Sequence, residues 1–413
     1  MADPRRSRQL ALLALVELLA MGLWFSASAV APELRVEWGL TDSGAAWLTN
    51  SVQLGFVAGA VLSAVFTLAD IWDPRRLIAG SALLGAGATA AIAGFGTGLE
   101  VALPLRFVTG LALAGIYPPG MKIVAGWFRE GRGMAIGVLI GALAIGTAAP
   151  HLLRPLGGIG AWRPVLWCSA ALAVVAAGVA SRGLRTGPWQ APAAPFDPRA
   201  VRRILADRAT MLANGGYFGH MWELYAMWTW IPAFLAASFA SDPSPGTTST
   251  LASVVAFATI AAGSLGAAAG GVLADRIGRT VVTSWSMVVS GLCCLAIGPL
   301  FGGPAWLIAA LCLVWGITVL ADSAQFSACV SELAEPEYVG TALTLQTAMA
   351  SSSRSSPSPS PGVGDIARLA VGVRTARDRA RPRHGACSSW PAPRGRPHRR
   401  RPSLAGRRRR GRL

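Results

Sequence analysis

The chain has 413 residues, of which 53% are hydrophobic and only 14% charged, and its mean hydropathy is +0.48. This composition excludes an ordinary soluble globule and indicates a polytopic membrane protein. A formal charge of +17 suggests a nucleic-acid-binding protein, but the charge is not spread over the chain. Residues 351–413 alone carry a net charge of +15. We therefore predict a lipid bilayer and no nucleic acid as the partner of this chain.

Apolar runs of about twenty residues are long enough to cross a bilayer as helices. In chain order the runs lie at residues 10–31, 47–69, 77–98, 101–121, 134–153, 160–180, 209–236, 251–274, 281–301 and 305–329. The first run resembles a signal peptide, but its length and the runs that follow favour a retained span. An eleventh run starts at 340–350 and then stops. The sequence predicts an all-α membrane protein with ten complete spans and half of an eleventh.

An eight-residue stretch occurs twice, and it relates the two halves of the chain. Residues 17–24 read ELLAMGLW, and residues 223–230 read ELYAMWTW. Internal repeats of this kind are typical of secondary transporters. We predict a first six-helix bundle at 1–181, a linker at 182–208, an incomplete second bundle at 209–350 and a disordered basic tail at 351–413.

Arginines favour one side of the predicted membrane. They follow the even-numbered spans and crowd the linker, which predicts a cytoplasmic N-terminus and a cytoplasmic linker. The chain has 36 Arg and one Lys, typical of a GC-rich gene, and its tail is rich in Arg, Pro, Ser and Gly. We interpret the tail as an out-of-frame product that truncates the second bundle after about residue 350. A natural basic tail that recruits a partner is the alternative.

Residues 271–280, between the eighth and ninth spans, read GVLADRIGRT. This stretch resembles the loop signature of the major facilitator superfamily, and the resemblance implies two bundles that rock about a central site. A short turn with a carboxylate can act as a latch, because the carboxylate binds Arg or a helix N-terminus. The predicted gating residues are Gly271, Asp275, Arg276, Gly278 and Arg279, with Asp70 in a degraded first-half copy.

The fourth span contains AGIYPPGMKIVAGWF and loosely resembles anion porters of the cyanate and nitrate kind. Nitrate porters carry Arg inside spans 2 and 8, and residues 47–69 and 251–274 have none. Nitrate is therefore disfavoured, and the substrate stays open.

Two acids are the main site candidates. Glu17 and Glu223 occupy matched places in the repeat, and the resemblance implies that both face the central cavity. A buried carboxyl group can exchange a proton, which is the chemistry of a proton-coupled carrier; a glutamate bonded to a neighbouring helix is the alternative. Polar and aromatic residues inside the spans complete the candidate set: Arg106, His220, Tyr217, Gln53, Asn50, Asp322 and Trp230.

The sequence thus predicts a monomeric secondary active transporter of a small solute, coupled to protons, in the cytoplasmic (inner) membrane. A drug or metabolite efflux carrier, a non-transporting sensor or scaffold, and an inactive truncated product are the alternatives. Neither a metal-ligand spacing nor a nucleotide-binding loop nor a catalytic triad is found, so we expect no enzyme, no cofactor and no metal.

Overall fold

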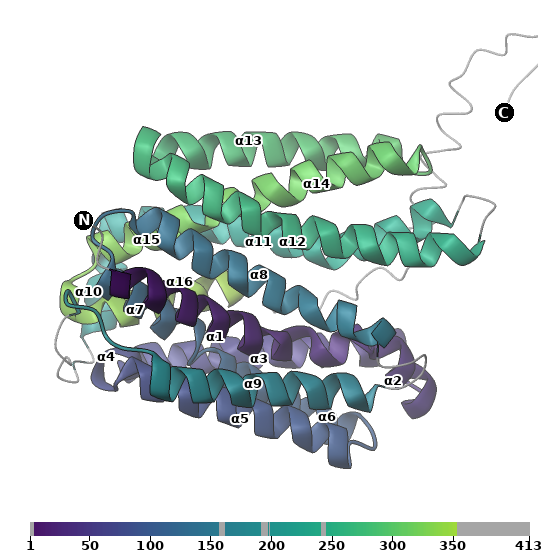
Figure 1. The fold of residues 1–413 in the computed structure, drawn as a ribbon, viewed down its shortest axis with the longest axis horizontal. Coiled ribbons are helices and arrows are strands. Elements are labelled where there is room, and N and C mark those ends of the chain that lie inside the picture. Colours follow the sequence, from purple (N-terminus) through teal and green to yellow (C-terminus); the bar gives the residue numbers. More distant parts are fainter. Residues whose placement is uncertain (1–3, 157–161, 191–196, 198, 241–244, 353–413) are drawn as a thin grey trace, which may run out of the picture. The chain divides into compact units, whose positions relative to one another are not determined.

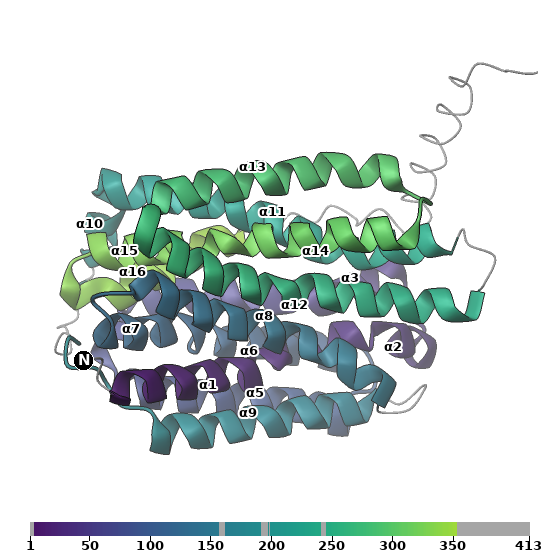
Figure 2. The ribbon, with the colours of Figure 1, turned by 45° about the horizontal axis from the view of Figure 1, so that its top comes forward.

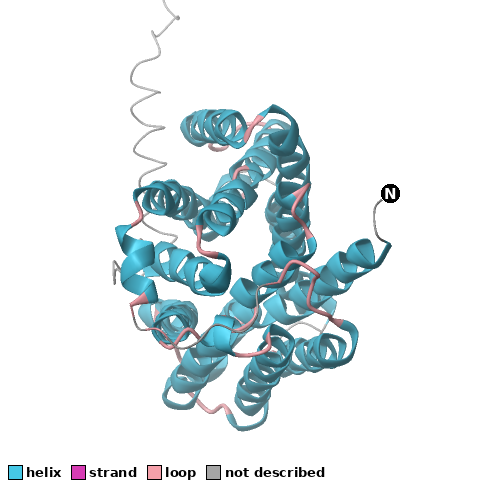
Figure 3. Cartoon of the chain, turned by 90° about the vertical axis from the view of Figure 1, so that its left-hand side faces the viewer, coloured by secondary structure: helices cyan, strands magenta, loops and turns pink. Residues whose placement is uncertain are grey.

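The computed structural model describes residues 4–156, 162–190, 197, 199–240 and 245–352. Within these residues every regular element is a helix, as Figures 1 and 3 show. The predicted all-α fold is therefore confirmed. The predictions for the tail fall on residues 353–413, which lie outside the described residues.

The first half of the chain contains α1 to α9. Their bounds are α1 (Pro4–Ala29), α2 (Ala31–Trp38), α3 (Asp42–Val65), α4 (Leu68–Ile71), α5 (Pro74–Phe95), α6 (Leu99–Leu113), α7 (Tyr117–Trp127), α8 (Arg132–Leu156) and α9 (Arg163–Gly183). The linker contains α10 (Ala200–Ala206). The second half contains α11 (Arg208–Phe239), α12 (Pro245–Ile277), α13 (Arg279–Ile297), α14 (Ala305–Ala321), α15 (Ser323–Leu333) and α16 (Val339–Ser352), with 3₁₀ turns at Gly298–Leu300 and Pro336–Tyr338.

Nine stretches of helix in the described residues are long and apolar enough to cross a membrane, and they correspond to nine of the ten predicted spans. The remaining predicted span, the seventh at residues 209–236, is α11. This 32-residue helix carries Asn214, His220 and Glu223 and is not among the nine. The half-span predicted at 340–350 appears as α16, whose 14 residues reach about 21 Å at 1.5 Å per residue.

The fourth and tenth spans are each broken at one point. The fourth divides into α6 and α7 at residues 114–116, just before Pro118 and Pro119. The tenth divides into α14 and α15 at Asp322. Ile116 and Asp322 are 206 residues apart, the same offset as the repeated octets, so the break is part of the repeat.

Two helix pairs join the halves along much of their length: α8 packs against α12, and α3 packs against α16. Figures 1 and 2 show α8 and α12 side by side. Glycines allow this approach, because a Cβ at Gly137 would lie 2.2 Å from the Ala267 carbonyl oxygen. A Cβ at Gly271 would likewise lie 2.4 Å from the Gly133 carbonyl oxygen. Small residues thus fix the spacing between the halves.

Candidate functional site

A cavity of about 50 Å³ lies between the halves. Side chains of α1, α3, α7, α8, α11, α14, α15 and α16 line it, and none of these described side chains is charged. Large aromatic and sulfur-containing groups dominate, among them Met21, Trp24, Phe56, Tyr217 and Trp228. One water-sized sphere needs about 10–15 Å³, so in this conformation the cavity is nearly closed.

Glu17 lies on α1 one turn before Met21, which lines the cavity; Glu17 itself is not among the cavity-lining residues. Its side chain is fully buried, and neither carboxylate oxygen has a hydrogen-bond partner among the described residues. It packs against the backbone of α7, since a Cβ at Gly120 would lie 2.6 Å from Glu17 Oε1. A buried, unpartnered carboxylate is costly, and the cost falls when the group carries a proton.

Glu223 is placed differently from its repeat partner. It accepts a short hydrogen bond from the Ser290 hydroxyl on α13, and the Trp315 indole nitrogen donates to the same hydroxyl oxygen at 3.1 Å. Glu223 therefore joins α11 to α13 and α14, and the cavity walls do not include it. The residues of α11 that line the cavity are Tyr217, Met221, Leu224, Tyr225 and Trp228. A role of Glu17 and Glu223 at the central site stays a prediction.

Three of the predicted polar residues meet where the tenth span is broken. His220 Nδ1 lies 2.8 Å from Asp322 Oδ1, and both side chains are buried. The His220 ring stacks on Tyr217 at 5.9 Å between centroids. Tyr117 of α7 and Tyr217 of α11 are both buried and both line the cavity. Buried polar groups of both halves therefore lie beside the cavity.

Arg106 is fully buried, and four of its five donors are occupied. Its guanidinium donates to the carbonyl oxygens of Leu23 at 2.9 Å and Leu48 at 3.1 Å, and also to the Trp24 carbonyl and the Ser26 hydroxyl. It thus ties α6 to α1 and α3 instead of pointing into the cavity. The remaining candidates, Asn50, Gln53 and Trp230, are half-buried and absent from the described cavity walls.

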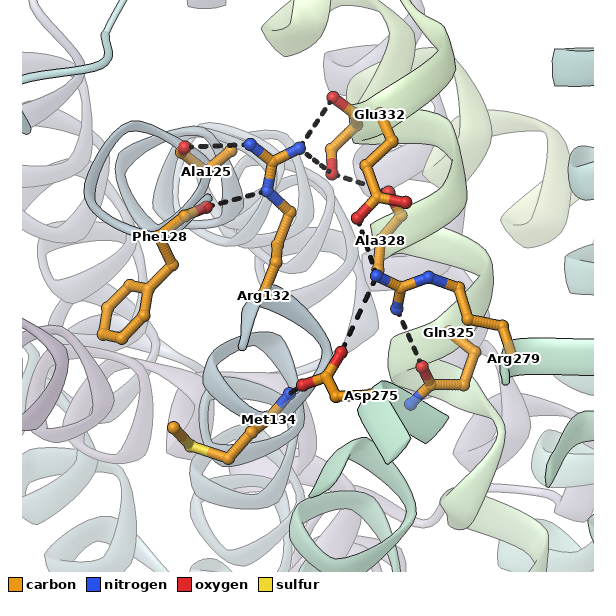
Figure 4. Close-up of polar contacts among 10 residues, drawn as sticks. Ala125, Phe128, Arg132, Met134, Asp275, Arg279, Gln325, Ala328 and Glu332 are labelled. Atoms are coloured by element: carbon orange, nitrogen blue, oxygen red, sulfur yellow. Dashed lines mark hydrogen bonds and ion pairs between the residues drawn. The ribbon is translucent and has the colours of Figure 1, made fainter. Parts of the chain in front are cut away.

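The loop that resembles the family signature contacts the opposite half, as Figure 4 shows. Asp275 Oδ2 accepts a 3.0 Å hydrogen bond from the Met134 backbone nitrogen, in the first turn of α8. Arg279 Nη2 lies 3.8 Å from Asp275 Oδ1 and donates to Glu332 Oε1 at 2.6 Å. Gly278 has φ +99°, a left-handed conformation that favours glycine, and Arg276 is exposed.

The first-half copy keeps its carboxylate contact despite its degraded sequence. Asp70 is buried and accepts from the backbone nitrogens of Gly340 at 3.0 Å and Thr341 at 2.6 Å, at the start of α16. Lys122 of α7 donates to Asp70 and to the Ala69 carbonyl. Lys122 was not among the predicted site residues, although a lysine next to an apolar span indicates a buried partner.

These two sets of contacts lie at the same end of the helices, where the linker residues 184–190 contact α7 (Figure 1). We call this the linker end, and we call the contacts of Asp70 and Asp275 the two latches. In each latch a carboxylate from one half caps a helix of the other half.

The comparisons with known proteins agree with one another on the family. The family model described as Major Facilitator Superfamily matches residues 13–356. A protein of Cupriavidus necator named "Probable sulfoacetate transporter SauU" is 25% identical over 274 residues, 60% of each chain. A "Chloramphenicol resistance protein" of Streptomyces lividans is 29% identical over 205 residues, 49% of this chain and 46% of the relative. The alignments thus span less than two thirds of these relatives.

Solved structures agree on the fold. The transporter FucP in its outward conformation has a TM-score of 0.63 and 15% identity, and the match covers 91% of this chain and all of that one. The proton:xylose symporter XylE has the same TM-score at 12% identity, over 91% of this chain and 90% of that one.

Proposed function

Because this chain belongs to the major facilitator superfamily, we propose that it moves a small solute across a membrane by alternating access and couples that movement to protons. The two helix bundles separate and close around the cavity between them. The latches hold the linker end closed in the conformation described here, and their release opens it.

Glu17 carries the proposal of proton coupling. It is fully buried beside the cavity, and its carboxylate oxygens have no hydrogen-bond partner in the described part of the chain. Tyr117 of the same half and Tyr217 of the other half line the cavity, and Tyr217 stacks on His220, which is paired with Asp322. A conformational change that hydrates Glu17 on one side allows its proton to leave there, which links proton release to the movement of the bundles.

The cavity chemistry favours an uncharged solute with an aromatic or apolar part. Aromatic and Met side chains offer stacking and dispersion contacts, with hydroxyl groups from Tyr117, Thr147 and Ser323 for orientation. A small anion would need a cation, and the described cavity walls hold none. This observation supports the efflux carrier of the drug or metabolite type over an anion porter such as one for sulfoacetate.

Orientation and setting belong to the same proposal. The positively charged loops support an N-terminus and a linker end on the cytoplasmic side of the inner membrane. Both halves of the central cavity come from one chain, which supports a functional monomer.

The test uses the full chain in liposomes loaded with a pH-sensitive dye. Chloramphenicol and sulfoacetate serve as the uncharged aromatic solute and the anionic solute. We expect a gradient of chloramphenicol, but not of sulfoacetate, to drive proton movement. Glu17→Gln should remove the proton movement while leaving membrane insertion intact, and Glu130→Gln, in the exposed turn before α8, should keep it. Solute-driven proton movement that is equal in Glu17→Gln and the wild type would contradict proton coupling through Glu17.

A further inference from the structure

A second, larger pocket of about 430 Å³ opens at the linker end and is separate from the central cavity. Its walls come from α7, the start of α8, the linker, and the second half from α15 to the start of α16. Three of its side chains are cations: Lys122, Arg129 and Arg132. Glu332 is its one acid among the described lining residues, and that carboxylate is bound by Arg279 at 2.6 Å.

The positive charge of the pocket is not balanced by the described residues. Arg129 and Arg132 form no ion pair with a carboxylate there, whereas Lys122 is paired with Asp70. Arg129 is exposed and stacks on the Trp189 ring at 4.0 Å from its centroid, and none of its five donors is used within the described chain. The pocket therefore has an excess of charge together with unused donors.

Arg132 is already held in position. Its guanidinium donates to the Phe128 carbonyl at 2.9 Å, the Ala125 carbonyl at 3.3 Å, and the Ser331 carbonyl and hydroxyl at 3.1 and 3.3 Å (Figure 4). These bonds are to neutral acceptors, so the full charge remains. They use four of its five donors and leave one. An arginine fixed by neutral groups is prepared to bind an anion without loss of side-chain freedom.

We propose that this pocket binds an anion that bears a phosphate group. A phosphate presents several oxygens, which can accept from Arg129, Arg132 and the third donor of Lys122 together. The stack on Trp189 directs the Arg129 guanidinium toward the same space. The volume exceeds that of a single phosphate and accommodates a larger phosphorylated solute or a lipid headgroup.

The position of the pocket gives the ligand a regulatory effect, and this part rests on the proposed function. The walls come from both halves and include Lys122 of one latch and Glu332, a neighbour of the other. The pocket divides when the halves separate at this end. A ligand that binds only the closed arrangement stabilises it. The phosphate-bearing anion therefore slows transport by keeping the linker end closed.

The experiment uses the single lysine of the chain as its reporter. Lys122 is the one Lys of the sequence, and it is buried and paired with Asp70, so an amine-reactive ester modifies this single internal site only as the linker end opens; mass spectrometry locates the product. The full chain in an uncharged detergent is treated with the ester, with and without inorganic pyrophosphate at constant ionic strength. We expect pyrophosphate to slow the modification of Lys122. The rate of Lys122 modification does not depend on transport. The proposed anion site can therefore fail this test while the proposed transport function stands.

Two substitutions and one control sharpen the result. Arg129→Gln and Arg132→Gln should each raise the pyrophosphate concentration that half-protects Lys122 about tenfold. A tenfold change corresponds to the loss of one charge-assisted contact. Arg129→Gln is the stronger test, because Arg129 is exposed and its loss leaves the fold intact. Arg76→Gln, an exposed arginine on α5 outside the pocket, should leave protection unchanged. Equal protection in the wild type and in Arg129→Gln would overturn the proposal.

Two further arms complete the test. Calorimetric titration with pyrophosphate should show about tenfold weaker binding to Arg129→Gln than to wild type, and the basic residues 351–413 add the same background to both proteins. Vesicles with and without phosphatidylglycerol separate the two sources of phosphate. Protection by pyrophosphate in detergent assigns the pocket to a free solute, and protection only in phosphatidylglycerol vesicles assigns it to a lipid headgroup. No protection in either arm, with equal titration of both proteins, refutes the site.

Discussion

Asp70→Asn should release the latch between the first half and α16. The carboxylate holds Lys122 and caps the start of α16 through Gly340 and Thr341, so the substitution leaves a buried ammonium without its counter-charge. Breaking a buried pair by removing one partner costs about 3–5 kcal/mol. If the closed state loses about 3 kcal/mol relative to an open state in which both groups are in water, the equilibrium shifts toward the open state about a hundredfold.

A cysteine at Thr344 measures this shift. Thr344 is fully buried and lies on α16 one turn beyond Thr341, so a thiol reagent reaches it after α16 moves away. We expect Thr344→Cys to be labelled at least tenfold faster in the Asp70→Asn background, since the labelling rate follows the open population. The native Cys312, fully buried in α14, should stay unlabelled and so exclude global unfolding. Asp73→Asn is the matched control, and equal labelling in wild type and Asp70→Asn would refute the latch.

Three further substitutions test the packing in detergent by thermal unfolding. Arg106→Lys should lower the unfolding temperature, because one ammonium cannot reach carbonyls on both α1 and α3 as a guanidinium does; an unchanged temperature would show that these bonds contribute little. Gly271→Ala should lower the free energy of unfolding by about 1–3 kcal/mol, because the added methyl group overpacks α8 against α12. Gly80→Ala, where a Cβ meets nothing within 4 Å, is the control and should be neutral or slightly stabilising. Similar effects at both sites would contradict the close approach of α8 and α12. Asp73→Ala should cost about 1 kcal/mol at neutral pH by removing the cap of α5. The hydrogen bond from the Arg75 side chain lowers the pKa of Asp73 below 3.8, so this stability is present above that value and is lost as the pH falls through the lowered pKa. The difference between wild type and Asp73→Ala should therefore narrow as the pH falls below 3.8, and a difference that does not change with pH would contradict the assignment.

Most of the fold was predictable because span length is a local property of the chain. An apolar run of about twenty residues forms a helix wherever it meets lipid, and nine predicted spans appear as such helices. The break in the fourth span had a local signal in Pro118 and Pro119. The break at Asp322 had none, and only the repeat relates it to the first break.

The site was less predictable because it depends on how each helix is rotated. The repeated octet gave Glu17 and Glu223 the same expected surroundings, but rotation about the helix axis is fixed by neighbouring side chains. Glu17 is fully buried with no hydrogen-bond partner among the described residues, whereas Glu223 accepts from Ser290. The carboxylate of Asp70 meets Thr341 across 271 positions of sequence, a contact that no local pattern encodes.

The breaks in the fourth and tenth spans have a mechanical consequence. Each leaves a short helix, α7 or α15, with one end in the central cavity and the other in the pocket at the linker end: Tyr117 and Lys122 on α7, Ser323 and Ser331 on α15. Eleven residues make each a rod of about 16 Å, hinged where the helical hydrogen bonds are interrupted. In the proposed transport cycle, a solute that displaces the cavity end of such a rod would tilt its other end, at the linker end, against the partner half. Binding in the cavity would then act on the two latches without any change in the longer helices.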